Sequence, residues 1–118
     1  MPARTVAVTG YKNSGKTRVI ETLTRALTKR EYKIGTIKHT ADNITLDTPG
    51  KDTQRHREAG SHATAILQEN TTVVFLDRHL TLQQAAEHLG PLDFLVIEGF
   101  KTLDTHARII VPRENSEL

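Results

Sequence analysis

The sequence predicts one α/β domain, in which helices flank a mostly parallel β-sheet and an antiparallel hairpin is added. Strand-like and helix-like segments alternate along the chain, as they do where helices join parallel strands. Residues 94–97 are apolar throughout, which is typical of a strand covered on both faces of such a sheet. The length of 118 residues suits a single domain spanning 1–118 and is too short for a second independent core.

Composition narrows the class of protein. Hydrophobic residues make up 36% and charged residues 25% of the chain, as in soluble globular domains. A net charge of +2 and an aromatic content of 4% argue against a nucleic-acid partner, because they indicate neither a basic face nor a stacking platform. The absence of cysteine excludes disulfides and thiolate metal sites. There is no apolar run long enough to cross a membrane and no signal peptide, so we expect a cytoplasmic protein without a membrane partner.

The first part of the chain predicts a strand, a glycine-rich loop, a helix and a second strand. Residues 5–9 form a β-branched run that ends at Gly10. From Thr17 onward, apolar residues recur at helical spacing. Residues 33–38 are strand-like, and the polar stretch 39–51 is predicted to be a loop, of a length that is uncommon unless the loop is functional.

The rest of the chain predicts a hairpin between two helices, followed by two strands. Asp52 is placed to cap a helix that runs to Ala59 and stops at Gly60. Residues 63–68 and 71–76 are strand-like and two residues apart, which predicts a tight hairpin. The remaining predicted elements are a helix at 80–89 with Thr81 as its cap, a buried strand at 93–98 and a last strand at 107–111.

The strongest functional signal is the segment Gly10-Tyr-Lys-Asn-Ser-Gly-Lys-Thr17, which matches the P-loop pattern G-x-x-x-x-G-K-[ST] between a predicted strand and a predicted helix. Glycines let the backbone curl around phosphate oxygens, and N–H groups at a helix N-terminus bind anions. Lys16 is expected to reach the β- and γ-phosphates and the Thr17 hydroxyl to ligate Mg²⁺. The alternative is a glycine-rich turn that only caps the helix. The predicted nucleotide-binding residues are Gly10, Lys12, Asn13, Ser14, Gly15, Lys16 and Thr17.

Glu98 is the next candidate. It ends the apolar strand and is followed by Gly99, so we expect its carboxylate at the carboxyl edge of the sheet, where open α/β sheets bind ligands. P-loop proteins place an acidic partner of Mg²⁺ or of water at this edge. Glu is one methylene longer than the usual Asp, which suits contact through water or orientation of a nucleophile. The alternative is an ordinary solvated carboxylate at a strand end.

Four further residues are weaker candidates. Lys38 and His39 leave the second strand at the same edge, where each is either a phosphate or substrate contact or an ordinary exposed side chain. Lys51 is a candidate of the same kind, and its neighbour Asp52 either caps a helix or acts on metal or water. Lys101 is a candidate substrate contact or part of an exposed contact surface. The six histidines lack the spacing of a metal site.

Several segments together resemble the molybdopterin-guanine dinucleotide biosynthesis protein B (MobB) family of P-loop NTPases. They occur in the family's order, and the resemblance covers about residues 4–112. The P-loop is shared by many NTPases, so the other segments make the resemblance specific. These are Gly35-Thr-Ile-Lys-His-Thr40, Asp47-Thr-Pro-Gly-Lys-Asp52, Arg57-Glu-Ala-Gly60 and Val96-Ile-Glu-Gly-Phe-Lys101.

The resemblance implies a homodimeric GTP-binding protein with weak, Mg²⁺-dependent hydrolysis that assists the molybdenum cofactor guanylyltransferase. Glu98 and Asp52 then act on water or metal, and Thr17 and Glu98 hold Mg²⁺. The guanine-reading segment of familiar GTPases is absent, because the nearest string, Thr28-Lys-Arg-Glu31, ends the first helix. Guanine preference therefore follows from the resemblance alone. Family members also continue with a strand and a terminal helix, which this chain is expected to lack.

Two other functions compete with this interpretation. A small P-loop kinase would need an arginine-bearing lid, for which Arg55 and Arg57 are the candidates. A nucleotide-gated interaction module would order the 39–51 loop around the γ-phosphate and present it to a partner. Phosphate release that depends on an acceptor would favour the kinase, and release that depends on a partner protein would favour an adapter.

Overall fold

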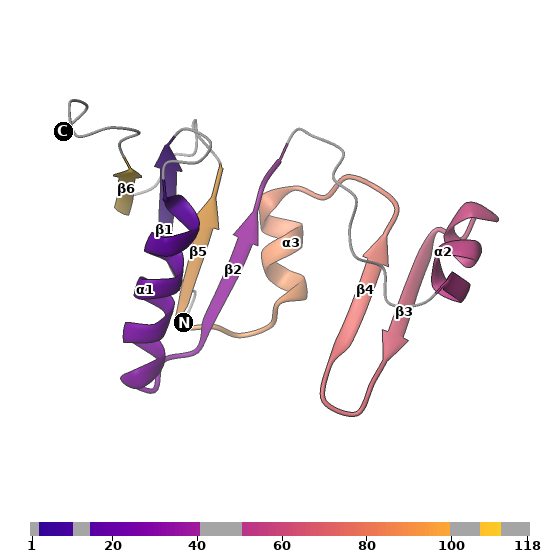
Figure 1. Cartoon of the computed structure of the whole chain (residues 1–118), viewed down its shortest axis with the longest axis horizontal. Coiled ribbons are helices and arrows are strands. Elements are labelled where there is room, and N and C mark those ends of the chain that lie inside the picture. The colour runs from indigo at the N-terminus through magenta and orange to yellow at the C-terminus, as the bar shows by residue number, and fades with distance from the viewer. Residues whose placement is uncertain (1–2, 11–14, 41–50, 100–106, 112–118) are drawn as a thin grey trace. The chain divides into compact units, whose positions relative to one another are not determined.

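The computed structural model describes residues 3–10, 15–40, 51–99 and 107–111 (Figure 1). They belong to two compact units, the first comprising residues 1–41 and 82–118 and the second residues 42–81. A mostly parallel sheet with flanking helices and a small antiparallel pair confirms the predicted fold class. The elements are β1 (Arg4–Gly10), α1 (Lys16–Lys29), β2 (Ile34–Lys38), α2 (Lys51–Glu58), β3 (Ala63–Leu67), β4 (Thr72–Leu76), α3 (Leu82–His88), β5 (Phe94–Glu98) and β6 (Ala107–Val111).

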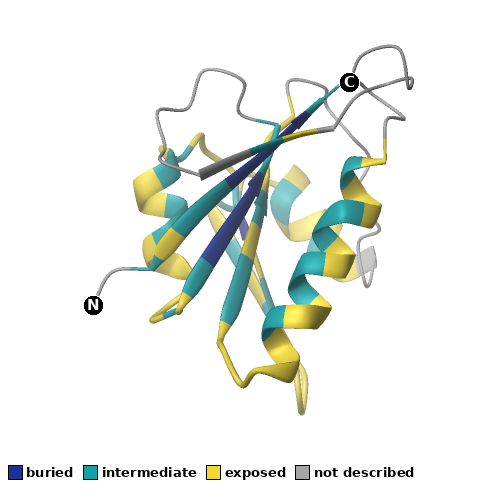
Figure 2. Cartoon of the chain, turned by 90° about the vertical axis from the view of Figure 1, so that its left-hand side faces the viewer, coloured by how far each residue is buried: buried dark blue, intermediate teal, exposed yellow. Residues whose placement is uncertain are grey.

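The sheet of the first unit has the strand order β2-β5-β1-β6, and every neighbouring pair is parallel. The central strands β1 and β5 have apolar middle residues, of which Ala7, Val8, Val96 and Ile97 are fully buried. Figure 2 shows this buried core along the two strands. Because all four strands are parallel, their carboxyl ends lie at the same edge of the sheet.

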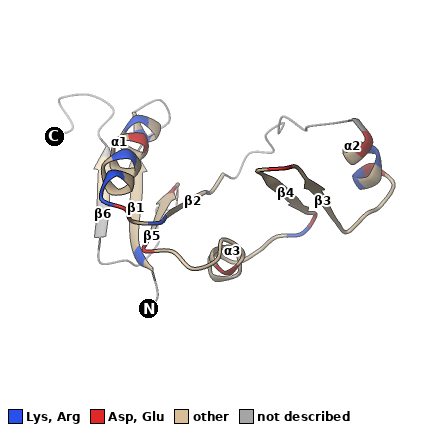
Figure 3. Ribbon diagram, turned by 90° about the horizontal axis from the view of Figure 1, so that it is seen from below, with Lys and Arg blue, Asp and Glu red and all other residues tan. Residues whose placement is uncertain are grey.

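The two helices described in this unit lie on opposite sides of the sheet, α1 against it and α3 beside β2. α1 packs against β1 and β2, and α3 lies on the opposite side of the sheet (Figure 3). Tyr32, which follows α1, packs edge-to-face against Phe94 with ring centroids 5.1 Å apart. On the other face, a side chain at Gly35 would meet Leu92, which follows α3. Since side chains alternate along a strand, Phe94, Val96 and Glu98 share the face that α1 covers.

The C-terminus of α1 is a Schellman motif that has glutamate in place of glycine. Glu31 adopts the left-handed conformation with φ 68°. Its N–H donates to the Thr28 carbonyl at 2.9 Å, and the N–H of Tyr32 donates to the Leu27 carbonyl at 3.2 Å. This turn brings Tyr32 back onto the sheet.

In the described part of the second unit, residues 51–81, a two-stranded antiparallel sheet is accompanied by one short helix. β3 and β4 pair in register, and the N–H of Gln68 donates to the Thr71 carbonyl at 2.9 Å, which confirms the predicted tight hairpin. α2 packs against β3. Arg57 of α2 donates two side-chain N–H groups to the Asp77 carboxylate, at 2.8 Å in the shorter contact, and its guanidinium carbon lies 4.4 Å from the centre of the Phe75 ring.

The predicted element boundaries agree with the structure to within about two residues. The prediction that Asp52 caps a helix is wrong, because α2 begins at Lys51 and Asp52 lies in its first turn, where a carboxylate still complements the helix dipole. Most of the predicted 39–51 loop lies outside the described residues. Among the helices that the structure describes, none has the length and apolar character needed to cross a membrane.

Candidate functional site

The candidate site lies at the carboxyl edge of the four-stranded sheet. β1 ends there at Gly10, β2 at Lys38 and β5 at Glu98. α1 begins beside the end of β1, since the side chain of its first residue, Lys16, contacts Gly10. The parallel topology thus brings together predicted residues that are far apart in the sequence.

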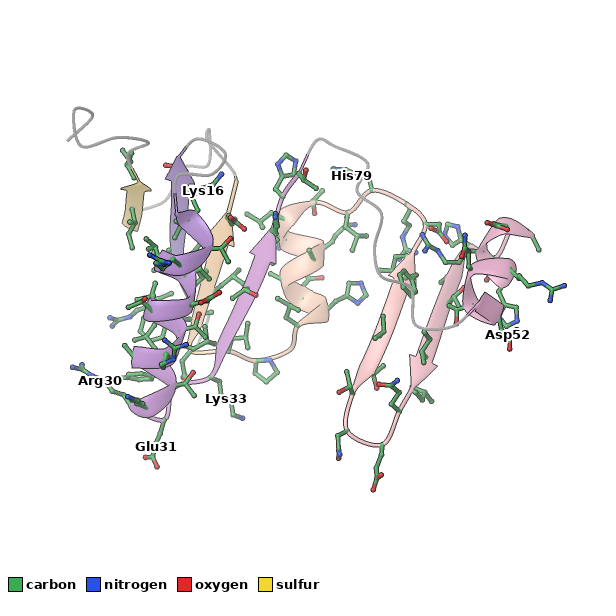
Figure 4. The ribbon with its side chains drawn as sticks, in the orientation of Figure 1. Lys16, Arg30, Glu31, Lys33, Asp52 and His79 are labelled. Atoms are coloured by element: carbon green, nitrogen blue, oxygen red, sulfur yellow. The ribbon has the colours of Figure 1, made fainter. Side chains whose placement is uncertain are left out.

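Lys16 is held against the end of β1. Its ammonium nitrogen Nζ donates to the carbonyl oxygen of Gly10 at 3.1 Å, and the side chain is partly buried. Figure 4 shows Lys16 at the N-terminal end of α1, next to the carboxyl end of β1. The positive charge therefore lies at the sheet edge rather than extending into solvent.

The first turn of α1 is suited to an anion. Gly15 precedes the helix in the left-handed conformation, with φ 100°, and provides no side-chain cap. The first intrahelical hydrogen bond runs from the N–H of Val19 to the Gly15 carbonyl at 3.1 Å. The turn also contains no acidic residue. Helix N–H groups that no capping side chain satisfies, together with the positive end of the helix dipole, bind phosphates.

Glu98 lies between the other two strands of the site. It is in register with Val8 of β1 on one side and with Lys38 of β2 on the other. Its side chain is half-buried and that of Lys38 is exposed. Glu98 shares the sheet face with Phe94, so its carboxylate is on the side of α1, whose first turn carries Lys16 and Thr17.

Gly99 has a positioning role that sequence reasoning missed. It adopts φ 100°, and a Cβ atom at this position would lie 2.5 Å from the carbonyl oxygen of His39. The N–H of His39 donates to the Glu98 carbonyl at 2.8 Å, and the N–H of Gly99 donates to the Val8 carbonyl at 3.3 Å. Glycine thus permits the close approach of two strand ends beside Glu98. The Glu-Gly pair after a buried strand was the available signal.

The donors at this edge fit Mg²⁺. Thr17 offers a hydroxyl from an exposed position in the first turn of α1, and Glu98 offers a carboxylate. Mg²⁺ prefers such oxygen ligands and is usually bound through one or two protein groups together with phosphates and water. In the described ranges there is no cluster of three or more His, Asp or Glu side chains that could hold a metal ion alone.

The remaining predicted residues lie in different parts of the chain. Lys51 and Asp52 belong to the second unit. His39 lies at the sheet edge directly after β2. Arg57, a candidate lid residue, is bound to Asp77 within the second unit. The predicted residues Lys12, Asn13, Ser14 and Lys101 lie outside the described residues.

Known proteins share both the sequence pattern and the fold. Residues 5–118 match the family model of molybdopterin guanine dinucleotide synthesis protein B, MobB. A relative from Methanocaldococcus jannaschii is 38% identical over 112 residues, which are 93% of this chain and 45% of the relative. The molybdopterin-guanine dinucleotide biosynthesis adapter protein of Escherichia coli is 30% identical over 117 residues, which are 94% of this chain and 66% of that protein. The chain therefore spans about half to two thirds of the length of these relatives.

The same fold occurs in a solved structure. The crystal structure of Bacillus subtilis MobB superposes with a TM-score of 0.74 at 24% identity. The match covers 98% of this chain and 83% of that one. At this level of identity the likeness concerns the fold, which is that of the α/β unit and hairpin described above.

Proposed function

Because the chain belongs to the MobB family, we propose that it is a GTP-binding accessory protein in molybdopterin-guanine dinucleotide biosynthesis. It hydrolyses GTP weakly with Mg²⁺ and acts as a homodimeric adapter of the molybdenum cofactor guanylyltransferase. The observation that carries the nucleotide-binding part is the position of Lys16, whose ammonium lies 3.1 Å from the Gly10 carbonyl beside a helix without a side-chain cap. The pathway is inferred from the family and from the name of the E. coli relative.

The residues at the sheet edge account for triphosphate binding. The first N–H groups of α1 donate to phosphate oxygens, and Lys16 adds charge-assisted hydrogen bonds. Lys38, exposed at the end of β2, contributes further positive charge at the same edge. Guanine preference is inferred from the family.

Mg²⁺, when bound, neutralises charge on the β- and γ-phosphate oxygens. Thr17 and Glu98 would hold it, and the Glu98 carboxylate also accepts a hydrogen bond from a water molecule and so orients it. Fast GTPases use an arginine that raises hydrolysis by about 10³ to 10⁵. We infer weak hydrolysis from the family alone.

The kinase alternative receives less support. A lid arginine must be free to reach the transferred phosphoryl group. Arg57 instead forms a two-pronged contact with Asp77 and stacks on Phe75. Arg55, the other candidate, is exposed on the same helix, so we favour the adapter because of the family to which the chain belongs.

Nucleotide affinity of Lys16→Ala tests the proposal. Loss of the ammonium removes charge-assisted hydrogen bonds, so GTP affinity is expected to fall at least about 100-fold while the fold is retained. Calorimetric titration with GTP, ATP and GDP, with and without Mg²⁺, measures this and the base preference. Lys33→Ala removes the same charge at the far end of β2 and should bind like the wild type. Unchanged GTP affinity in a folded Lys16→Ala protein would sink the assignment.

Glu98→Gln tests the role of the carboxylate. Gln keeps the length and hydrogen-bonding capacity of the side chain but removes its charge, so phosphate release is expected to slow about ten-fold, with affinity changed less than about three-fold. Glu69→Gln, in the exposed hairpin turn, is the matched control. Hydrolysis at the wild-type rate would show that the Glu98 carboxylate does not contribute to GTP hydrolysis. Asp52 would then be the next residue to test.

The hairpin supports the homodimer. Leu67 is 80% exposed and Val74 55% exposed, and both lie on the face of the hairpin opposite Phe75. A second copy would cover these apolar side chains. Light scattering at micromolar concentration is expected to report a dimer, and a monomer over the whole range would contradict it.

A further inference from the structure

We propose that the outer flank of α1 is a docking surface for an acidic helical segment of a partner protein. The flank is an open groove of about 490 Å³ lined by Ile20, Glu21, Thr24, Arg25, Thr28 and Lys29. All six residues belong to α1, so the groove runs along one helix. The inference rests on the proposed function only in that an adapter must bind another protein.

The spacing of the lining residues indicates what shape would fit. They form two parallel rows, 20-24-28 and 21-25-29, in which successive residues are four apart. Side chains four apart form a ridge on a helix, and two adjacent ridges enclose a groove that receives a ridge of another helix. Residues 21, 25, 28 and 29 are exposed and residues 20 and 24 are half-buried. The occupant that this shape fits is therefore a helix.

The positive charge of α1 indicates that the docking helix of the partner carries acidic residues. α1 holds four basic residues and one acidic residue, so its net charge of +3 exceeds the +2 of the whole chain. Figure 3 shows the basic residues along α1. Arg25 and Lys29 lie one turn apart on the groove, and the ion pairs of the described residues include neither. Glu21, one turn before Arg25, offsets part of this positive charge, so the excess lies toward Lys29, and acidic side chains one turn apart on a facing helix would complement Arg25 and Lys29.

The floor of the groove favours a protein over a lipid surface or a nucleic acid. Ile20, Thr24 and Thr28 form the inner row. Membrane-surface helices bury Trp, Phe or Leu, which this row does not contain. A phosphate backbone is negative along its whole length and would be repelled by Glu21 at the start of the outer row, whereas a peptide helix can place a neutral or basic residue opposite Glu21. An amphipathic helix with a stripe of small apolar residues beside its acidic residues complements both rows.

A synthetic peptide serves as the probe. It is an 18-residue helix former with an apolar stripe flanked by glutamates one turn apart, and its control is a scrambled peptide of the same composition. Fluorescence anisotropy on the full chain measures affinity, and amide chemical shifts map the contact. We expect binding of the ordered peptide with shifts confined to α1. Arg25→Gln with Lys29→Gln should weaken binding about five-fold, whereas Arg55→Gln with Arg78→Gln, the same loss of charge in the second unit, should leave it unchanged.

Several results would overturn the proposal. Equal binding of both peptides, or equal binding by the two double variants, would show that net charge and not the groove is recognised. Binding of vesicles with 30% phosphatidylserine or of duplex DNA in place of the peptide would assign the flank to another class of partner. A change in oligomeric state of the Arg25→Gln, Lys29→Gln variant would assign it to a second copy of the chain.

The two proposals fail separately. Lys16→Ala is expected to lose GTP and keep the peptide, and the Arg25→Gln, Lys29→Gln variant to lose the peptide and keep GTP. If Lys16→Ala keeps GTP, nucleotide binding is refuted while docking stands. If the double variant keeps the peptide, docking is refuted while nucleotide binding stands.

Discussion

The two units of the chain are stabilised by different means. In the first, Ala7 and Val8 of β1 and residues 95–97 of β5 form a continuous buried core. In the second, Phe75 is the one buried hydrophobic side chain among those described, and the Arg57 guanidinium lies over its ring. A two-stranded sheet is at best marginally stable alone in water. The second unit therefore depends on contacts at its surface.

This difference corresponds to a difference in role. The candidate site needs strand ends that keep their relative positions, and the buried core of the first unit supplies that rigidity. The second unit holds its helix to its hairpin through a partly exposed ion pair, Arg57 with Asp77. Such a pair responds to pH, whereas a core of apolar side chains has no group that titrates. We therefore expect substitutions and pH to change the stability of the two units by different amounts.

The largest contrast is expected from the same substitution in each unit. Ile97→Ala removes a fully buried side chain from β5 and should lower the free energy of unfolding by about 4 kcal/mol. Ile66→Ala removes a half-buried side chain from β3 and should cost about 1 kcal/mol. Urea unfolding measures both. Similar losses would mean that the two units share one core.

Two glycines with similar backbones give the next contrast. Gly99 has φ 100° and Gly60 has φ 109°, so alanine is strained at both. A Cβ at Gly60 meets no atom within 4 Å, whereas at Gly99 it meets the carbonyl oxygen of His39. Gly60→Ala should therefore cost about 1 kcal/mol and Gly99→Ala about 3 kcal/mol in the same unfolding experiment. A smaller loss for Gly99→Ala would mean that the strand ends beside Glu98 can separate.

The smallest effect is expected from pH and should be confined to the second unit. Hydrogen bonds from the Arg57 guanidinium lower the pKa of the Asp77 carboxyl from its ordinary value. The folded unit thus favours the charged carboxylate, and the stabilisation is complete above the unfolded pKa of about 3.9. It is lost as pH falls through the lower pKa of the folded state.

Amide hydrogen exchange of β3 and β4 between pH 5 and pH 2 measures this loss. At pH values under about 4, the protection of these amides in the wild type should decrease. The decrease should be larger than in Asp77→Asn, which has no carboxylate to titrate. Amides of β5 serve as the internal control. An identical pH profile for the two proteins would remove the Asp77 carboxylate as the cause.

Local patterns predicted the elements, because periodicity and turn residues report on neighbours in the sequence. The Gly10–Thr17 motif indicated the start of α1, and the apolar run ending at Glu98 indicated a central strand. The strand order could not be predicted in the same way, since β1 pairs with β5 and β6 across most of the chain. Pairing over such separations depends on tertiary packing.

Three further features also lay beyond local patterns. Glu31 carries the left-handed turn after α1 without the glycine that usually signals it. Arg57 and Asp77 are 20 residues apart and meet only because the hairpin folds back. The start of α2 was misjudged by two residues, since Asp52 suits a cap and a first turn almost equally. In each case the contact or conformation depends on more than the neighbouring residues in the sequence.

The hydrogen bond from Lys16 to the Gly10 carbonyl holds the ammonium at the sheet edge before any ligand binds. An ammonium has three N–H donors, so two remain for an incoming anion while one stays on the carbonyl. The side chain therefore loses less rotamer freedom on binding than a lysine extended into solvent would lose. For the triphosphate that we propose as ligand, part of the entropic cost of ordering Lys16 is thus met when the chain folds, which is preorganisation of the site.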